Sequence, residues 1–258
     1  MMEAMKKYRS TWAAALLLAG AMSLSAFAYD ADKVDKYGLV RSDLATWTQR
    51  KDSFPENGEV SINGSSPLST MGCSYYATFF MLCRMGIKDP LTDTAWEFAL
   101  ECKRKKLSRD GTGYFDPRSI SRLTGGRVRF VEEGNYENYY DGQSGAGKCE
   151  SQEDMYKFLR RLTEKGYFLI ACAVGNVTNY QDEEYYSEGH YVYIDSVGED
   201  DMVIGDSAFP GTRWSDNWGA GDGHIVKVYA YKLLDESGKM IKPSERQSMY
   251  VKRSEDED

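Results

Sequence analysis

Cys73, His190 and Asp206 are the residues whose types and settings point most directly to chemistry. Cys73 follows Met71 and Gly72 and comes directly before a strongly apolar stretch. Such a stretch is typical of a helix that is buried on every side. A thiol at the start of a helix faces the positive end of the helix dipole, which favours the thiolate. Cys73 is therefore a candidate nucleophile; the alternative is a cysteine that only packs at a helix start.

His190 and Asp206 have the setting of a general base and the group that orients it. His190 opens one predicted strand and Asp206 ends the next, and the two lie at equal distances along the chain from Gly198, where the turn between the strands begins. In a regular antiparallel hairpin they would stand opposite each other on one face. A carboxylate beside an imidazole fixes its tautomer and supports the imidazolium. The alternative is a strand-end histidine near a solvated aspartate. The spacing assigns no such role to His224, which is interpreted as structural or as a cleft residue.

The elements that must position these residues change type along the chain. Apolar periodicity, caps and turn residues predict helices first and antiparallel strands later, which indicates the α+β class. The helices are predicted over residues 74–85, 92–105, 116–123 and 151–165, a loop over 133–150, and strands from residue 128 and over 167–174, 190–197, 202–205 and 225–233.

Two stretches resemble a known family. Residues 71–77, Met-Gly-Cys-Ser-Tyr-Tyr-Ala, lead into an apolar helix that ends Arg-Met-Gly at 84–86; they resemble the nucleophile helix of papain-like cysteine peptidases, above all the bacterial branch related to the double-glycine (bacteriocin-leader) peptidases. Residues 189–198, Gly-His-Tyr-Val-Tyr-Ile-Asp-Ser-Val-Gly, followed by Val-Ile-Gly-Asp-Ser at 203–207, resemble the hairpin that carries the base and its orienter in that branch. The resemblance covers about residues 47–207.

The resemblance implies a papain-like fold, in which N-terminal helices, with the nucleophile on a buried central helix, pack on a C-terminal antiparallel sheet. It implies that Cys73 is the nucleophile, His190 the base and Asp206 the orienter. Family members use a thiolate–imidazolium pair and form an acyl-enzyme that water resolves. No cofactor and no metal are implied.

The sequence departs from the family pattern at two points. Ser74 stands where the family often has glycine, and the chain lacks the glutamine that many members carry shortly before the cysteine as an oxyanion donor. Gln49, within residues 47–52, resembles a glutamine that some bacterial members carry further upstream, and is therefore the candidate oxyanion donor. Loss of one such donor typically lowers the rate by about 10²–10³.

The N-terminus has the features of a secretory signal peptide. Lys6, Lys7 and Arg9 precede an apolar stretch over residues 12–24, and Ala-Phe-Ala at 26–28 fits a signal-peptidase site. The sequence therefore predicts export, to the cell envelope or outside the cell, with an uncleaved interfacial anchor as the alternative. The predicted organisation is a signal peptide over 1–28, an N-terminal segment packed on the domain over 29–66, a peptidase domain over 67–250, and an acidic tail over 251–258.

The net charge limits the classes of partner, and the cysteine count limits the possible disulfides. The formal net charge of −8 becomes −10 once residues 1–28, with three positive side chains and one negative, are removed. This sign disfavours nucleic acid and anionic membrane surfaces, so a peptide or protein substrate is expected; no oligomeric state is predicted. The odd number of cysteines leaves at least one thiol free or shared between chains. Cys83 and Cys172 lie in apolar runs and are interpreted as buried, whereas Cys102 and Cys149 are not assigned.

Two other functions fit the same residues. The chain could be a secreted binding module that keeps a peptidase-like fold without turnover, or an acyl or amide transferase that uses the same thiol. Residues 181–189, which hold four carboxylates just before His190, predict a substrate with basic residues near the scissile bond. The alternative there is a solvated acidic loop.

Overall fold

The computed structural model describes residues 48–51, 55–63, 66–89, 92–107, 115–136, 148–149, 151–178, 184–209, 213–218 and 223–241. The predicted signal peptide, most of the segment 29–66 and the acidic tail lie outside the described residues, so these boundaries stay predictions. Among the helices that are described, none is long and apolar enough to cross a membrane.

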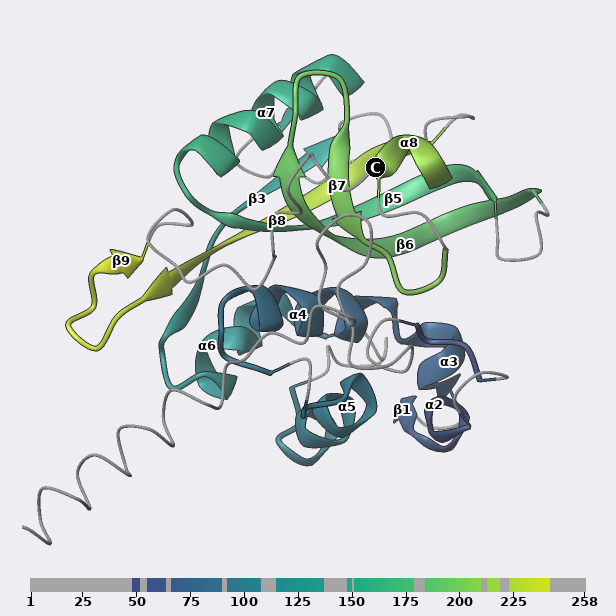
Figure 1. Ribbon diagram of the computed structural model, residues 1–258, viewed down its shortest axis with the longest axis vertical. Coiled ribbons are helices and arrows are strands. Elements are labelled where there is room, and N and C mark those ends of the chain that lie inside the picture. The colour runs from purple at the N-terminus through teal and green to yellow at the C-terminus, as the bar shows by residue number, and fades with distance from the viewer. Residues whose placement is uncertain are drawn as a thin grey trace, which may run out of the picture. The chain divides into compact units, whose positions relative to one another are not determined.

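A seven-stranded sheet occupies the centre of the domain (Figure 1). Its strands follow the order β4 (Lys148–Cys149), β3 (Val128–Tyr136), β8 (His224–Leu234), β5 (Phe168–Thr178), β6 (Glu184–Val197) and β7 (Met202–Gly205), with β9 (Met240–Ile241) paired to β8. The pair β3–β4 is parallel and the other pairs are antiparallel. A small antiparallel sheet joins β1 (Ser61–Asn63) to β2 (Ser66–Pro67).

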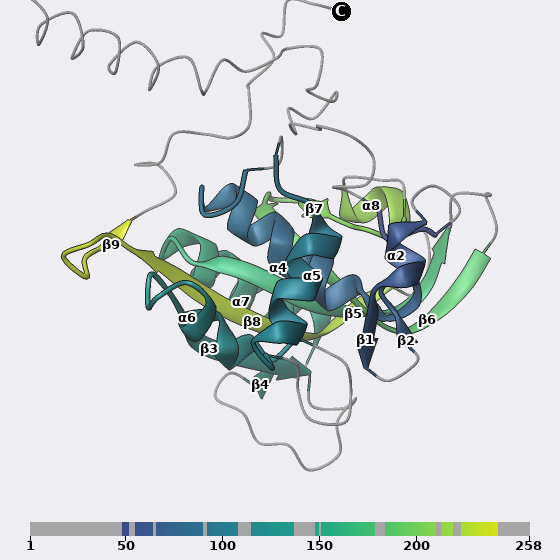
Figure 2. The same cartoon turned by 90° about the horizontal axis from the view of Figure 1, so that it is seen from below.

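Helices cover both faces of the large sheet (Figures 1 and 2). One face carries α4 (Cys73–Arg84), with α6 (Ile120–Leu123) beside it and α5 (Ala95–Arg104) on the side of α4 away from the sheet. The other face carries α7 (Gln152–Glu164) and α8 (Trp214–Asn217). Alternate residues of β5 serve the two faces, because side chains alternate along a strand. Ile170 packs in the cluster that includes α4, whereas Leu169 and Ala171 pack in the cluster that includes α7. Helices and a mostly antiparallel sheet thus confirm the α+β class.

The central helix α4 is buried along almost its whole length. Every residue from Cys73 to Cys83 is buried, as the apolar sequence predicts for a helix covered on all sides. Phe79 packs against Phe98 of α5, with 6.0 Å between the ring centroids. At the other end of α4, Arg84 Nε lies 2.9 Å from Asp195 Oδ1 of β6. The helix is therefore held between α5 and the sheet.

Capping residues set several of the helix starts. Thr94 caps α5 by accepting from the backbone N–H of Glu97, and Ser151 caps α7 by accepting from that of Asp154 at 3.1 Å. Residues 116–123 form a 3₁₀ turn, η3 (Pro117–Ser119), followed by α6, rather than one helix. Two short elements, α2 (Glu56–Glu59) and α3 (Leu68–Met71), lead into α4.

Several predicted boundaries are wrong, among them the end of β5, which lies at Thr178 instead of residue 174, and the start of α5, which lies at Ala95 instead of residue 92. Strand β3 continues to Tyr136 into the predicted loop 133–150, where β4 also lies, and β6 begins at Glu184 rather than at His190. Polar residues in these parts of the two strands hid them from a search for apolar alternation. Backbone pairing with neighbouring strands, which a polar side chain does not prevent, forms them nonetheless.

Candidate active site

Cys73 is the first residue of α4, and Gly72 makes its position possible. A Cβ at Gly72 would overlap the carbonyl oxygen of Leu68, so the short helix α3 and the start of α4 approach each other too closely for any side chain there. The first backbone N–H groups of a helix have no partner within the helix and carry its positive dipole end. Cys73, 6% exposed, is held beside that end.

His190 and Asp206 meet, but not through the predicted pairing. His190 Nε2 lies 2.8 Å from Asp206 Oδ1. The prediction that the two stand directly opposite is wrong: Val197 pairs with Met202, so the hairpin is centred after Gly198, and beyond a one-residue irregularity between Ile194 and Ser196 it is Tyr193 that pairs with Gly205. Asp206 directly follows Gly205 at the end of β7. Continuing the antiparallel register by one residue from the pair Tyr193–Gly205 places Asp206 opposite Val192 of β6. Val192 and His190 are two residues apart and share a face, which is why the side chains still meet.

Several donors hold the Asp206 carboxylate in place. Oδ1 accepts the backbone N–H groups of Ala208 at 3.0 Å and Phe209 at 3.2 Å in addition to the contact with His190. Oδ2 accepts Nε1–H of Trp218 at 3.2 Å. The Asp206 side chain is fully buried. A buried carboxylate with this many donors is held in one orientation.

The His190 ring lies between aromatic side chains and Cys73. Trp218 stacks on it with 6.0 Å between centroids, and Phe209 meets it edge-on at 5.2 Å. Burial lowers the pKa of the ring, but the charge and hydrogen bond of Asp206, together with a hydrogen bond to Cys73, raise the pKa of His190 to about 10. Because Nε2 faces Asp206, Nδ1 is the nitrogen left for the thiol. His190 is thus in contact with both partners and favours its charged form.

Gln49 lies beside this group, held at both ends of its amide. Its Oε1 accepts from Ser207 Oγ at 2.8 Å, and its Nε2 donates to the carbonyl oxygen of Ser69 at 3.3 Å. Its backbone N–H also donates to the carbonyl oxygen of Ser207 at 3.0 Å. Ser207 follows Asp206, and Ser69 lies in α3 just before Cys73. The amide N–H₂ therefore faces the side on which the nucleophile helix begins.

Ser74 and His224 have local environments that account for them. The hydroxyl of Ser74 accepts the backbone N–H of Phe115 at 3.1 Å, so the serine at this family departure ties α4 to the segment that precedes η3. His224 begins β8, where it pairs with Val174 of β5. The pairing with Val174 gives His224 no role as a second base for Cys73.

The other four cysteines are present as buried thiols. Burial raises the pKa of Cys172 to about 12, with the nearby Cys73 as a second cause. Burial is also the first cause of the raised pKa values of the remaining three, which are Cys83, Cys102 and Cys149. In the described part of the chain, no group of three or more His, Cys, Asp or Glu side chains is placed to hold a metal ion.

Trp218 and Ser207 belong to this site and were missed from the sequence. Trp218 lies four residues after Trp214, which stacks on it at 5.4 Å, so the spacing indicates a common helix face. Nothing in that spacing indicates that the indole N–H reaches Asp206. Ser207 carries no signal of its own, because its partner Gln49 is distant in the chain.

The arrangement as a whole can activate a thiol. A cysteine at a helix start touches an imidazole that a buried carboxylate orients, and an amide donor lies alongside; such a group can attack an electrophilic carbonyl and exchange a proton with the leaving group. Comparisons with known proteins add nothing to this geometry: no family model, no curated protein and no solved structure matches the chain.

Proposed function

We propose that this chain is a secreted cysteine peptidase with a papain-like fold and Cys73 as its nucleophile. One observation carries the proposal: the His190 ring is bonded to Asp206 on one side and to Cys73 on the other, at the start of a buried helix. A core histidine needs partners for its two ring nitrogens, but neither partner has to be a carboxylate or a thiol. A histidine that joins a buried carboxylate to a thiol has the arrangement of a base with its orienter and its nucleophile.

The proposed reaction uses His190 twice. The Cys73 thiolate attacks the peptide carbonyl carbon, and the His190 imidazolium gives its proton to the leaving amine as the C–N bond breaks. A water molecule then gives a proton to neutral His190 and attacks the thioester carbon. Release of the carboxylic acid breaks the C–S bond and restores the thiolate–imidazolium pair. Asp206 keeps its charge throughout and stabilises the imidazolium.

The negative oxygen that forms at each attack needs donors. The backbone N–H of Cys73, at the start of α4, and the Nε2–H of Gln49 are the two donors that we assign. Gln49 fits this role because Ser207 holds its Oε1 and thereby directs Nε2 toward the nucleophile side. Preorganised donors of this kind stabilise the transition state without reorganisation.

The papain-like assignment rests on how the elements are combined. The nucleophile begins a buried helix, the base lies on an antiparallel sheet that this helix covers, and the three residues follow in the order cysteine, histidine, aspartate. Export rests on residues 1–28. N-terminal sequencing of protein recovered from the cell exterior or envelope should give Tyr29 first; an intact residue 1 there would contradict the predicted cleavage.

The test is turnover of a mixed peptide library by residues 29–258, read by mass spectrometry with and without prior alkylation. Product peptides should form, and Cys73→Ala and His190→Ala should abolish them. The matched controls are Cys102→Ala and His224→Ala, which remove the same side-chain types elsewhere and should leave turnover measurable. Equal loss from both histidine variants, with folding intact by circular dichroism, would contradict the assignment of the base.

The same experiment separates the alternative functions. A transferase would join the acyl half of the peptide to an added amine in preference to water, which shows as a product of higher mass. A binding module would yield no product while retaining peptides on the Cys73→Ala protein. Hydrolysed products without amine adducts support the peptidase.

A further inference from the structure

Next to Cys73, three residues form a row across neighbouring strands. Cys172 on β5 pairs with Tyr191 on β6 and with Lys227 on β8, and residues paired in this way share a face. That face is the one α4 covers, because Tyr191 and Tyr229 of the next pair along β8 pack against the cluster that α4 helps to form. The row therefore lies on the nucleophile side of the sheet.

Lys227 lies on this face by the regular alternation of β8, two residues before Tyr229, and an irregularity just beyond it turns Val226 onto the same face. The pairing of β8 with β5 passes from Lys227 to Ile225 and leaves Val226 as the extra residue. Val226 packs with Cys172 and Val174, while Ile225 packs on the opposite face, so Val226 and Lys227 both face the α4 side. The Gln152 side chain bonds both backbone groups of Ile225, at 2.9 and 3.0 Å. A bulge re-aims side chains in this way.

Aromatic rings hold Lys227 and connect it to the nucleophile. Its Nζ lies 5.2 Å from the centre of the Tyr229 ring, which is stacked on Tyr191 at 6.3 Å. Tyr191 and Cys172 are close enough to Cys73 for charge on its sulfur to act on both. Tyr191 directly follows His190. A continuous set of side chains thus runs from the reacting atoms to a positive charge.

The row is partly exposed on its outer side. Tyr191 and Lys227 are only half-buried, and Gly189, beside them, is exposed. Among the described residues, a Cβ added at Gly189 would meet only the Cys172 sulfur, at an ordinary contact distance of 3.6 Å. A substrate that reaches Cys73 can therefore extend over Cys172.

We propose that Tyr191, Tyr229 and Lys227 form a subsite for an acidic side chain, glutamate or aspartate, near the scissile bond of the substrate. The subsite rests on the proposed peptidase function and names the substrate class for it. The two rings supply apolar contact for the stem of the side chain, and the ammonium of Lys227 supplies charge for its carboxylate. The preference is opposite to the one that the acidic segment 181–189 predicts. Lys227 is placed on the face that leads to Cys73, whereas the first three residues of that segment, 181–183, lie outside the described residues.

Matched peptides test the preference. A cleaved peptide is resynthesised with Glu, Gln or Lys at each of the positions around the scissile bond. At one position the wild type should cleave the Glu peptide about fivefold faster than the Gln peptide in kcat/KM, as expected for a partly exposed ion pair, and the ratio should shrink at high salt. Lys227→Met should bring the Glu-to-Gln ratio to one, and Lys227→Glu should reverse it in favour of the Lys peptide.

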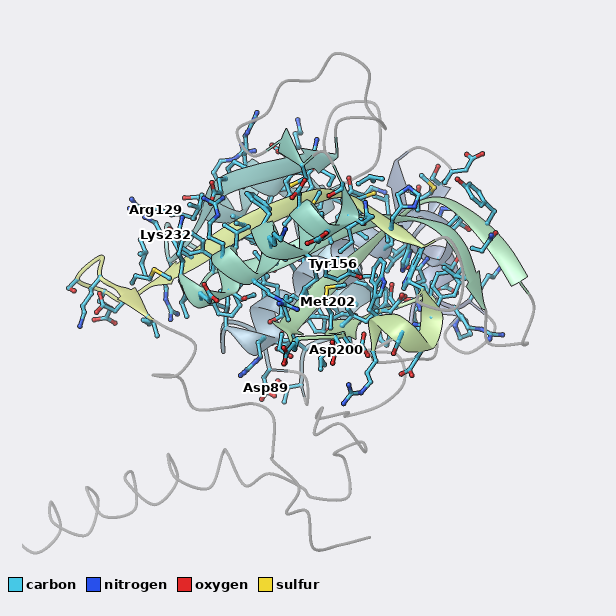
Figure 3. The ribbon with its side chains drawn as sticks, turned by 90° about the horizontal axis from the view of Figure 1, so that it is seen from above. Asp89, Arg129, Tyr156, Asp200, Met202 and Lys232 are labelled. Carbon is cyan, nitrogen blue, oxygen red and sulfur yellow. The ribbon has the colours of Figure 1, made fainter. Side chains whose placement is uncertain are left out.

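Lys232→Met is the matched control. Lys232 lies on the same strand, paired with Arg129 of β3, and the two are seen side by side in Figure 3. Lys232 points to the opposite face from Lys227. Val228 and Ala230 lie four and two residues before Lys232, so they share its face, and they pack on the α7 side. This variant removes the same charge from β8 and should keep the Glu-to-Gln ratio of the wild type. A preference for the Lys peptide, or equal ratios in wild type and Lys227→Met, would overturn the subsite.

A second measurement keeps the subsite testable if no peptide is cleaved. Cys73 is alkylated with iodoacetate, which is negative, and with iodoacetamide, which is neutral, and the ratio of the two rates is compared between proteins. Lys227→Met should lower the ratio several-fold relative to wild type and to Lys232→Met, since a nearby positive charge concentrates the anion. An unchanged ratio overturns the subsite whether or not turnover occurs, whereas absent turnover with a lowered ratio contradicts only the peptidase.

Discussion

At the scale of single residues, environment separates Cys73 from the other four thiols. Of the five cysteines, Cys73 is the one that begins a helix and contacts the imidazole of His190. The others lie in the core, and burial raises their pKa values. Because the thiolate is the reactive form, reactivity should be concentrated at one position even though five cysteines are present.

Alkylation should therefore be selective for Cys73. With iodoacetamide at neutral pH, we expect one adduct per chain on the native protein, located at Cys73 by peptide mapping. His190→Ala should slow the reaction by at least about tenfold, because it removes the imidazolium that stabilises the thiolate. Cys73→Ala should leave the native protein unlabelled. A first adduct at Cys172 or Cys149 would show that the nucleophile is misassigned.

Ser207 illustrates a residue that acts through another. It does not touch the sulfur, but its hydroxyl holds Oε1 of Gln49, and so fixes which end of the amide faces Cys73. Gln49→Ala should lower kcat by about 10²–10³, as for other lost oxyanion donors. Ser207→Ala should lower kcat by a smaller factor, about tenfold, with KM little changed, since the donor remains but is less well held.

The combination of the two variants makes this prediction specific. If Ser207 acts only by orienting Gln49, the double variant should be no slower than Gln49→Ala alone. Ser207→Thr, which keeps the hydroxyl, should recover most of the lost kcat. Additive losses in the double variant, at equal stability, would show that Ser207 has a separate role.

At the scale of elements, the sequence predicted the main helices and strands because each carries its own signal. The apolar run of α4, the cap Ser151 and the turn at Gly198 are local features. What could not be predicted depends on contacts between distant segments: the one-residue shift in the hairpin, the end of β3, and the bond between Gln49 and Ser207. Cys73, His190 and Asp206 were singled out because type and spacing marked them, and the structure brings them together. Trp218 was not, since a tryptophan is usually only core.

The contact of the hairpin with α4 depends on a glycine. Gly205 ends β7, and a Cβ there would lie 2.7 Å from Phe80 of α4. Gly205→Val should destabilise the protein by about 1–3 kcal/mol, because the methyl groups must displace a fully packed ring. Urea unfolding measures this loss. Val203→Leu, which enlarges a half-buried side chain of the same strand, should cost clearly less.

Gly205→Val should also lower activity, because it displaces a site residue without changing its type. Gly205 directly precedes Asp206, so a shift of β7 away from α4 would move the carboxylate relative to His190. We expect kcat to fall more than KM rises. If Gly205→Val unfolds like the wild type, then the contact between β7 and α4 is looser than the distances indicate.

At the scale of the whole molecule, His190 connects the two sides of the fold. Its ring packs on Phe209 and Trp218, which belong to the core that includes α7, while it bonds to Cys73 at the start of α4. The charge of the ring therefore contributes to the stability of the entire domain. A group of this kind makes unfolding depend on pH in a defined direction.

The direction follows from the pKa of His190, which is about 10 in the folded protein against a reference of 6.5. Below pH 6.5 both states hold the proton, and the stabilisation from Asp206 is fully present. Between pH 6.5 and about 10 the unfolded chain has lost the proton that the folded protein keeps. The unfolded state then binds fewer protons, so the free energy of unfolding falls as pH rises through this window.

We therefore expect the His190 contribution to stability to be lost progressively on the alkaline side, and activity to fall there too once the imidazolium is gone. Urea unfolding at a series of pH values from 6 to 10 measures it as the difference between wild type and Asp206→Asn, which removes the charge that favours the imidazolium. That difference should be largest near pH 6 and shrink toward pH 10.

Asp200→Asn is the control, because Asp200 is exposed in the turn between β6 and β7 (Figure 3). Its difference from wild type should be small throughout. A difference for Asp206→Asn that does not change with pH would mean that His190 is not charged in the folded protein, and that the base is neutral before the substrate binds.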